Sequence, residues 1–184
     1  MEDSYFPLPI TAILLIILIN LSNATIDDTQ FIKATCQTTP YPDLCFSSLS
    51  ADAVSVHGSL RSMTIAALTV ALTHTRSASS MVASLAKSNA LAPQETWALR
   101  DCIEELGDSV EELQSSVAEL KDGDGSRPET DDIRTWVSAA LTDDDTCMEG
   151  LVGDGGGVKE SVRGLVVDVA QLTSIALSLV SHLK

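Results

Sequence analysis

The sequence has 184 residues, with 26 Asp or Glu against 11 Lys or Arg and a formal net charge of −15. A chain of this length forms about one domain with a sizeable core, and its negative charge would repel a polyanion, which argues against nucleic acid as a partner. Hydrophobic residues make up 45% and aromatic residues only 4%, so the composition disfavours an all-β sandwich and fits helices packed on helices.

The chain begins with an apolar run over residues 9–21, which is shorter than a typical membrane-spanning helix. Small residues follow it at positions that fit cleavage after Ala24, so we predict a signal peptide over 1–24. The segment before the run carries two acidic residues and no basic one, which leaves an uncleaved signal anchor as the alternative. We expect the mature chain, 25–184, to be secreted and extracellular, with no membrane contact after cleavage.

Prolines and apolar periodicity divide the mature chain into helices. Pro40 and Pro42 interrupt two short helices, predicted over 29–38 and 43–51, and these form an N-terminal helical hairpin within about 25–52. Four long helices follow, over 59–87, 93–120, 129–151 and 158–183.

Two of the long helices, the second and the fourth, have apolar residues at alternating steps of four and three. This is the pattern of an amphipathic helix with one buried side. The connections are short, at 89–93, 122–128 and 153–157, and long helices joined by short loops pack antiparallel. We therefore predict an all-α fold, an antiparallel four-helix bundle over about 57–184 with the hairpin at its N-terminal end.

The predicted mature chain contains four cysteines, Cys36, Cys45, Cys102 and Cys147. An even number behind a secretion signal is typical of two disulfides, and the sequence alone allows three pairings. No Cys-x-x-Cys spacing occurs and the three histidines are scattered, so the pattern does not favour a metal site. We expect neither a metal nor a cofactor.

Four short motifs invite a catalytic or ion-binding interpretation, and each fails on spacing or geometry. The loop from Asp122 lacks the glycine and the glutamate of a calcium-binding loop, and the glycine-rich stretch before Lys159 lacks phosphate-loop spacing. The segment 57–59 lacks the second glycine of a nucleophile elbow. The consecutive aspartates 143–145 point about 100° apart on a helix, so we interpret them as a solvated face. We expect the protein not to be an enzyme, because no nucleophile, base and oxyanion hole come together.

The predicted second long helix carries charges of only one sign over most of its length. From Asp101 to Glu119 there are seven acidic residues and no basic one. Glu104, Asp108 and Glu111 follow at steps of four and three, off the apolar side, and like charges at this spacing destabilise a helix by about 0.2–0.5 kcal/mol per pair. This face is either a merely soluble surface or a binding face for a positively charged or hydrogen-bonding protein.

Three stretches of the sequence resemble the signatures of the plant invertase/pectin methylesterase inhibitor family. They read FIKATCQTTPYPDLC at 31–45, ALRDCIEEL at 98–106 followed by DSVEEL at 108–113, and TWVSAALTDDDTC at 135–147. The resemblance implies the bundle with its hairpin, secretion to the cell wall or vacuole, and no catalytic activity. It also implies the pairing of the cysteines, Cys36 with Cys45 and Cys102 with Cys147.

The family contains inhibitors of two enzymes. Inhibitors of invertase carry a Pro-Lys-Phe motif between the third and fourth cysteines, which this sequence lacks. The run from Trp136 to Thr142 looks like the pectin methylesterase branch, so the resemblance implies an inhibitor that caps the pectin-binding cleft of pectin methylesterase in a reversible one-to-one complex. Acid invertase as the target, or a non-inhibitory cell-wall binding protein of the same fold, are the alternatives. Since no catalytic β-helix follows Lys184, we expect a free-standing inhibitor that is monomeric when free.

The resemblance also implies contact residues. Counted from the third and fourth cysteines, the family's contact positions fall on Glu104, Asp108, Glu111, Thr146 and Glu149. If the enzyme surface presents carboxylates, we expect inhibition to be stronger at mildly acidic pH. If it is basic, we expect the reverse, with added salt weakening the complex.

Overall fold

The computed structural model describes residues 13, 28–88, 91–123, 127–151 and 157–183. All regular elements in these ranges are helical. Residues 28–36 form a helix, and the other elements are α2 (Pro42–Leu49), the short 3-10 turn η1 (Ser50–Asp52), α3 (Ala53–Val56), α4 (Leu60–Leu85), α5 (Pro93–Asp122), α6 (Arg127–Gly150) and α7 (Gly157–Ser181). The predicted signal peptide, 1–24, lies outside the described residues except for Ile13, which is helical.

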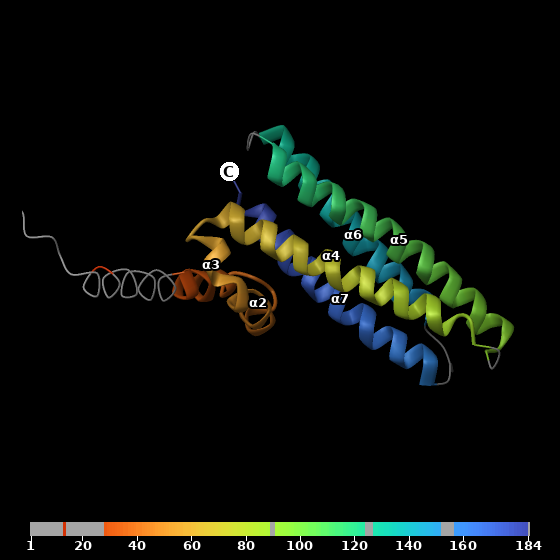
Figure 1. Cartoon of the computed structure of the whole chain (residues 1–184). Coiled ribbons are helices and arrows are strands. Elements are labelled where there is room, and N and C mark those ends of the chain that lie inside the picture. Colours follow the sequence, from red (N-terminus) through yellow and green to blue (C-terminus); the bar gives the residue numbers. More distant parts are fainter. Residues whose placement is uncertain (1–12, 14–27, 89–90, 124–126, 152–156, 184) are drawn as a thin grey trace, which may run out of the picture.

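The four long helices form the predicted antiparallel bundle (Figure 1). Each packs against two neighbours in a closed cycle, α4 on α5, α5 on α6, α6 on α7 and α7 on α4. Each of the six predicted helices is found, with its ends within two residues of their predicted positions, whereas the short elements η1 and α3 between the hairpin and α4 were not predicted. The all-α fold predicted from helix-breaking residues and apolar periodicity is therefore confirmed. Residues 89–90, 124–126 and 152–156 of the predicted connections lie outside the described ranges.

Side chains near the helix ends explain why two of the long helices begin where they do. Ser59 is the N-cap of α4, and its hydroxyl accepts a hydrogen bond from the Ser62 backbone amide at 3.3 Å, which satisfies one of the free N–H groups of the first turn. His57 and Gly58 both have positive φ and turn the chain into this cap. At α5, Pro93 occupies the first helical position, and the Glu95 carboxylate accepts from the Ala92 amide at 2.9 Å.

The interior consists of two hydrophobic clusters stacked along the bundle. One, toward the hairpin, includes Met63, Leu113 and Leu179, and the other, around the second disulfide, includes Leu106 and Val166. Between the two clusters each long helix contributes a buried polar residue that is 0% exposed. These residues are Thr75 on α4, Ser109 on α5, Asp144 on α6 and Thr173 on α7.

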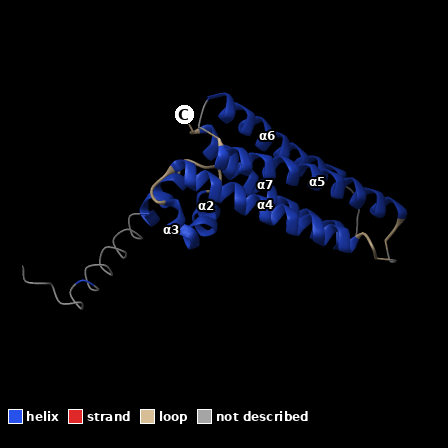
Figure 2. Ribbon diagram, turned by 45° about the horizontal axis from the view of Figure 1, so that its top comes forward, coloured by secondary structure: helices blue, strands red, loops and turns tan. Residues whose placement is uncertain are grey.

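The hairpin is closed by the disulfide between Cys36 and Cys45 and packs beside α4 and α7 (Figure 2). Its buried residues Ile32 and Leu49 belong to the same cluster as the core of the bundle. The hairpin therefore shares the main core of the protein.

The helix α7 is apolar and long enough, at 25 residues, to meet the length and hydropathy criteria for a membrane span. Ten of its residues are buried in the bundle. Packing against α4 and α6 accounts for this apolar composition, because a core helix needs a broad apolar side.

Candidate partner-binding face

The acidic face predicted from the sequence lies on the outer side of α5. This helix turns a row of leucines at steps of seven into the core, and all are buried: Leu99, Leu106, Leu113 and Leu120. Its opposite side is left open to solvent. Glu104, Asp108 and Glu111 are all exposed there, which agrees with their predicted position off the apolar stripe.

The disulfide between Cys102 and Cys147 holds α5 against α6, with the two Cα atoms 4.3 Å apart. Next to it runs a groove of about 340 Å³ between the two helices. Its walls are Ala98, Asp101, Cys102 and Glu105 on α5 and Thr146, Cys147, Glu149 and Gly150 on α6. The covalent link restrains the two walls relative to each other at this point of the bundle.

The five residues predicted as contacts therefore divide into two sets. Thr146 and Glu149 are exposed residues of the groove wall, whereas Glu104, Asp108 and Glu111 lie on the exposed side of α5 and do not line the groove. The Thr146 hydroxyl donates to the Thr142 carbonyl at 2.8 Å, so toward a partner it presents acceptor lone pairs.

Two further acidic residues of the groove, Asp101 and Glu105, were missed by the sequence analysis as individual site residues. They stand one position before and three positions after Cys102, so the cysteine itself marked the place. Burial raises the pKa of Glu105, and the charges of Asp143, Asp108, Glu104 and Asp101 raise it further. The face thus concentrates negative charge on both sides of the α5–α6 seam.

Beneath the exposed face, two carboxyl groups interact across the seam. Burial raises the pKa of Glu112 on α5 to about 7, with further contributions from Asp143 on α6 and Asp108. Burial also raises the pKa of Asp143. One buried oxygen of each, Glu112 Oε2 and Asp143 Oδ2, has no hydrogen-bond partner among the described residues. Protonation of one carboxyl allows the pair to share a hydrogen bond, because a carboxylate alone can only accept.

The interpretation of 143–145 as a solvated face was wrong for Asp144, whose exposure is 0%. Its Oδ1 accepts from the Ser109 hydroxyl at 3.0 Å, and its Oδ2 lies 2.9 Å from the Thr173 hydroxyl. That hydroxyl is also 3.1 Å from the Val169 carbonyl and has one hydrogen for the two contacts. Both contacts are satisfied when Asp144 is protonated and donates to Thr173.

The environment of Asp144 favours this neutral form. Burial raises its pKa to about 7, although the hydrogen bonds that Thr173 and Ser109 donate to the ionised carboxylate act in the opposite direction. None of the ion pairs found among the described residues involves it. Asp144 is thus a structural acid in the bundle interior and is not available to a partner on the surface.

The candidate chemical groups considered in the sequence have structural surroundings in the described residues. No group of three or more His, Cys, Asp or Glu is placed to hold a metal ion in these ranges. The His57–Ser59 segment, considered above as a nucleophile elbow, is the entry to α4, where Ser59 serves as a helix cap. His182, directly after the end of α7, forms a hydrogen bond through Nδ1 with the Ser178 carbonyl of that helix.

Comparison with known proteins gives a consistent result at the levels of family and sequence. The family model described as plant invertase/pectin methylesterase inhibitor matches residues 30–179. A "21 kDa protein" of Daucus carota is 40% identical over 160 residues, covering 83% of each chain. Two Arabidopsis thaliana proteins, Pectinesterase inhibitor 10 and Pectinesterase inhibitor 9, are 41% and 40% identical, and in each case 83% of this chain is covered, with 50% and 80% of the relative.

The fold agrees with these matches. A crystal structure of a mutant form of a pectin methylesterase inhibitor from Arabidopsis superposes with a TM-score of 0.68 at 23% identity, covering 81% of this chain and 94% of that one. Both disulfides of the structure also have the pairing that the resemblance implied. The fold, the cysteine pairing and the sequence matches together show that this chain belongs to the plant invertase/pectin methylesterase inhibitor family.

Proposed function

We propose that the mature chain inhibits pectin methylesterase by covering the enzyme's pectin-binding cleft in a reversible one-to-one complex. The observation that carries this proposal is the continuous acidic surface along the α5–α6 seam. It joins the exposed side of α5, with Glu104, Asp108 and Glu111, to the groove that Thr146 and Glu149 line. A bulky bundle seated on a cleft excludes a polymeric substrate without performing any chemistry.

The face is suited to binding because it is rigid and strongly acidic, with several exposed carboxylates and one basic neighbour on α5, Arg100, one turn before Glu104. The disulfide between Cys102 and Cys147 fixes the two helices, so little conformational entropy is lost when a partner docks. The exposed carboxylates of Glu104, Asp108 and Glu111 repel one another along one helix. A partner that supplies Lys, Arg or hydrogen-bond donors relieves this repulsion, which gives both affinity and specificity.

Secretion fits the same proposal. The described part of the chain contains two disulfides, and such bonds persist in oxidising, extracellular compartments. The apolar run at 9–21 supplies the signal sequence. We propose that the mature chain acts in the cell wall, where it meets its target.

Parallel titrations of pectin methylesterase and acid invertase test the proposal. Purified mature protein, 25–184, is added stepwise to each enzyme, and ester hydrolysis or sucrose hydrolysis is followed. We expect methylesterase activity to fall to near zero at one equivalent and to return on dilution, with invertase unaffected. Loss of invertase activity alone would make invertase the target, and full activity of both enzymes would favour a non-inhibitory binding protein.

A further inference from the structure

Trp97 is an unusually exposed tryptophan close to the proposed binding face. Its exposed fraction is 70%, against 39–47% for the other exposed large hydrophobic side chains of the described residues, Ile13, Tyr41 and Met81. Tryptophan is on average a highly buried residue. Burying its ring against a partner would release a large apolar area from water.

The register of α5 places Trp97 on the same side of the helix as the acidic residues. Starting from Trp97, steps of four, three, four and three residues lead to Asp101, Glu104, Asp108 and Glu111, and side chains at these spacings line one face. All five are exposed. The row of exposed acidic residues therefore extends back to Asp101, and Trp97 is the next residue of the same row toward the start of α5.

The neighbours of Trp97 connect it to the groove as well. Ala98, the next residue, and Asp101, one turn further along, both line the groove between α5 and α6 together with Glu149. Trp97 thus stands at the point where the groove and the acidic side of α5 meet. The ring is held in the second turn of a helix whose start is fixed by Pro93.

We propose that Trp97 is the aromatic anchor of the binding face and receives a Lys or Arg side chain of the target enzyme. A cation is attracted to the face of an indole ring and, in the same position, to the carboxylates that follow along α5. Tryptophan is enriched among the few residues that carry most of the energy of a protein interface. This inference rests on the proposed function and assigns to it a residue that charge alone did not select.

Two measurements on the complex test the role of Trp97. In the first, Trp97→Ala is compared with the parent in the methylesterase titration, with Met81→Ala on α4 as the matched control for loss of an exposed apolar side chain. We expect Trp97→Ala to weaken inhibition by about tenfold or more and Met81→Ala to inhibit like the parent. Both side chains are exposed, so neither change is expected to affect folding, which circular dichroism checks.

The second measurement observes the ring directly. The inhibitor is labelled with fluorotryptophan, unlabelled methylesterase is added, and fluorine NMR follows the two tryptophans. We expect the Trp97 resonance to shift or broaden on complex formation, while Trp136, which is half-buried against the core, serves as the internal control. The Trp136→Phe variant assigns the two signals.

The outcomes separate this inference from the proposed function. If the parent inhibits methylesterase and Trp97→Ala inhibits equally well, the inference that Trp97 is an anchor is wrong and the proposed function stands. If the parent neither binds nor inhibits methylesterase, the proposed function is wrong and the role of Trp97 falls with it.

Discussion

Asp144 makes the stability of the bundle depend on pH. Burial raises its pKa from an ordinary value of 3.8 to about 7. Between these two values the folded protein holds a proton that the unfolded chain has released. The stabilisation is fully present below about pH 4 and is lost progressively as the pH rises to about 7. Glu112, whose pKa burial also raises to about 7, acts in the same direction.

We predict that Asp144→Asn reduces this pH dependence. The amide is similar in shape and carries no charge, so it has no ionisation to disfavour burial as the pH rises. Its second N–H lacks a partner, which lowers the free energy of unfolding by about 1–3 kcal/mol equally at every pH. Urea unfolding from about pH 4.5 to 8 should show the parent losing up to about 1.4 kcal/mol per pH unit for each raised group, and the variant should lose less. The exposed neighbour Asp145 provides the control, since Asp145→Asn should follow the parent. Parallel profiles for parent and Asp144→Asn would contradict the assignment of a buried titrating acid.

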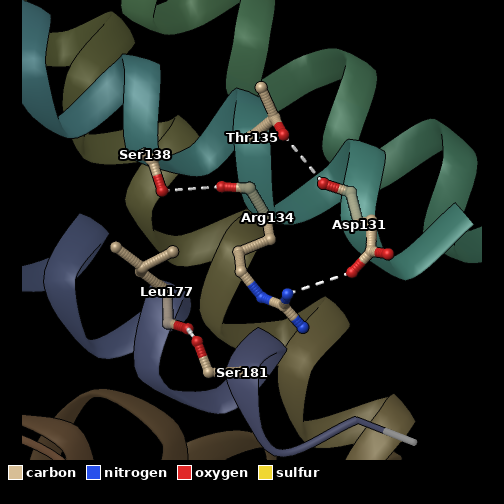
Figure 3. Close-up of polar contacts among 6 residues, drawn as sticks. All are labelled: Asp131, Arg134, Thr135, Ser138, Leu177 and Ser181. Carbon is tan, nitrogen blue, oxygen red and sulfur yellow. Dashed lines mark hydrogen bonds and ion pairs between the residues drawn. The ribbon is translucent and has the colours of Figure 1, made fainter. Parts of the chain in front are cut away.

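The two ion pairs found among the described residues differ in burial. Arg61 Nη2 lies 3.0 Å from Glu129 Oε1, and the Glu129 side chain is only 4% exposed. The same guanidinium donates to the Gly123 carbonyl at 3.0 Å. It therefore ties the end of α5 and the start of α6 to α4. Arg134 and Asp131 form the other pair, also at 3.0 Å, on the exposed side of α6 (Figure 3).

We predict that Arg61→Met destabilises the protein far more than Arg134→Met. The first change removes the guanidinium from a buried carboxylate and should cost about 3 kcal/mol, at the low end for a buried pair because the Arg61 side chain is 34% exposed. An exposed pair contributes less than about 0.5 kcal/mol. Urea denaturation of both variants measures the difference. Equal losses of unfolding free energy in the two variants would mean that the buried ion pair stabilises the protein no more than the exposed one.

At the scale of elements, the second disulfide ties together the two helices of the proposed binding face. It joins positions 45 residues apart, whereas the hairpin disulfide joins positions 9 apart. In the chain-entropy model, these loops correspond to about 4 and about 3 kcal/mol of stabilisation. The longer loop is also the one that fixes the α5–α6 groove.

We predict that replacing Cys102 and Cys147 by serine lowers the free energy of unfolding by a few kcal/mol and weakens inhibition. Replacing Cys36 and Cys45 should cost somewhat less stability and affect inhibition less, because these residues lie in the hairpin and not along the seam. Thermal unfolding and the methylesterase titration measure the two effects. A larger loss of inhibition in the hairpin variant would place the binding face elsewhere.

The helices themselves could be predicted closely because their ends carry local signals. Pro93 marks the start of α5, and periodicity marked the buried sides of α5 and α7. The buried polar residues between the two hydrophobic clusters were not predicted. In the sequence, a serine or threonine at a core position looks like an interruption of the apolar stripe. Asp144 was misread because it was judged with its sequence neighbours. It belongs instead to a row of buried residues on α6 at steps of four and three: Ile133, Val137, Ala140, Asp144 and Cys147.

The groove could not be predicted because it depends on how two helices meet. The sequence placed Glu104, Asp108 and Glu111 on one side of a helix. It contained no information on which side of α6 would adjoin them, so the positions of Thr146 and Glu149 came only from the family resemblance. The structure now puts these two residues on one wall of the groove, opposite Asp101 and Glu105.

At the scale of the whole molecule, a rigid bundle presents one strongly acidic seam. The two hydrophobic clusters and the disulfides hold the scaffold, and the carboxyl groups beneath the seam lose their protons as the pH rises toward neutrality. We therefore expect the scaffold to be most stable under acidic conditions. We expect inhibition to be determined by the position of the acidic residues on α5 and not by the net charge of −15.

The most direct test compares two triple variants with the same change in charge. One carries Glu104→Gln, Asp108→Asn and Glu111→Gln on the proposed face. The other carries Asp132→Asn, Glu160→Gln and Asp168→Asn, which are also exposed but lie on α6 and α7. Both should fold. The α5 changes remove mutual repulsion, and the α6–α7 changes remove exposed carboxylates, of which Glu160 in the first turn of α7 contributes at most about 1 kcal/mol.

The measured quantity is the inhibition constant for pectin methylesterase, determined at about pH 5 and about pH 7.5 with both variants and the parent. We predict that the α5 variant is weaker than the parent by about tenfold or more, while the α6–α7 variant inhibits like the parent. An α5 variant that inhibits as well as the parent at both pH values would contradict the account and leave the acidic face as solvated surface only.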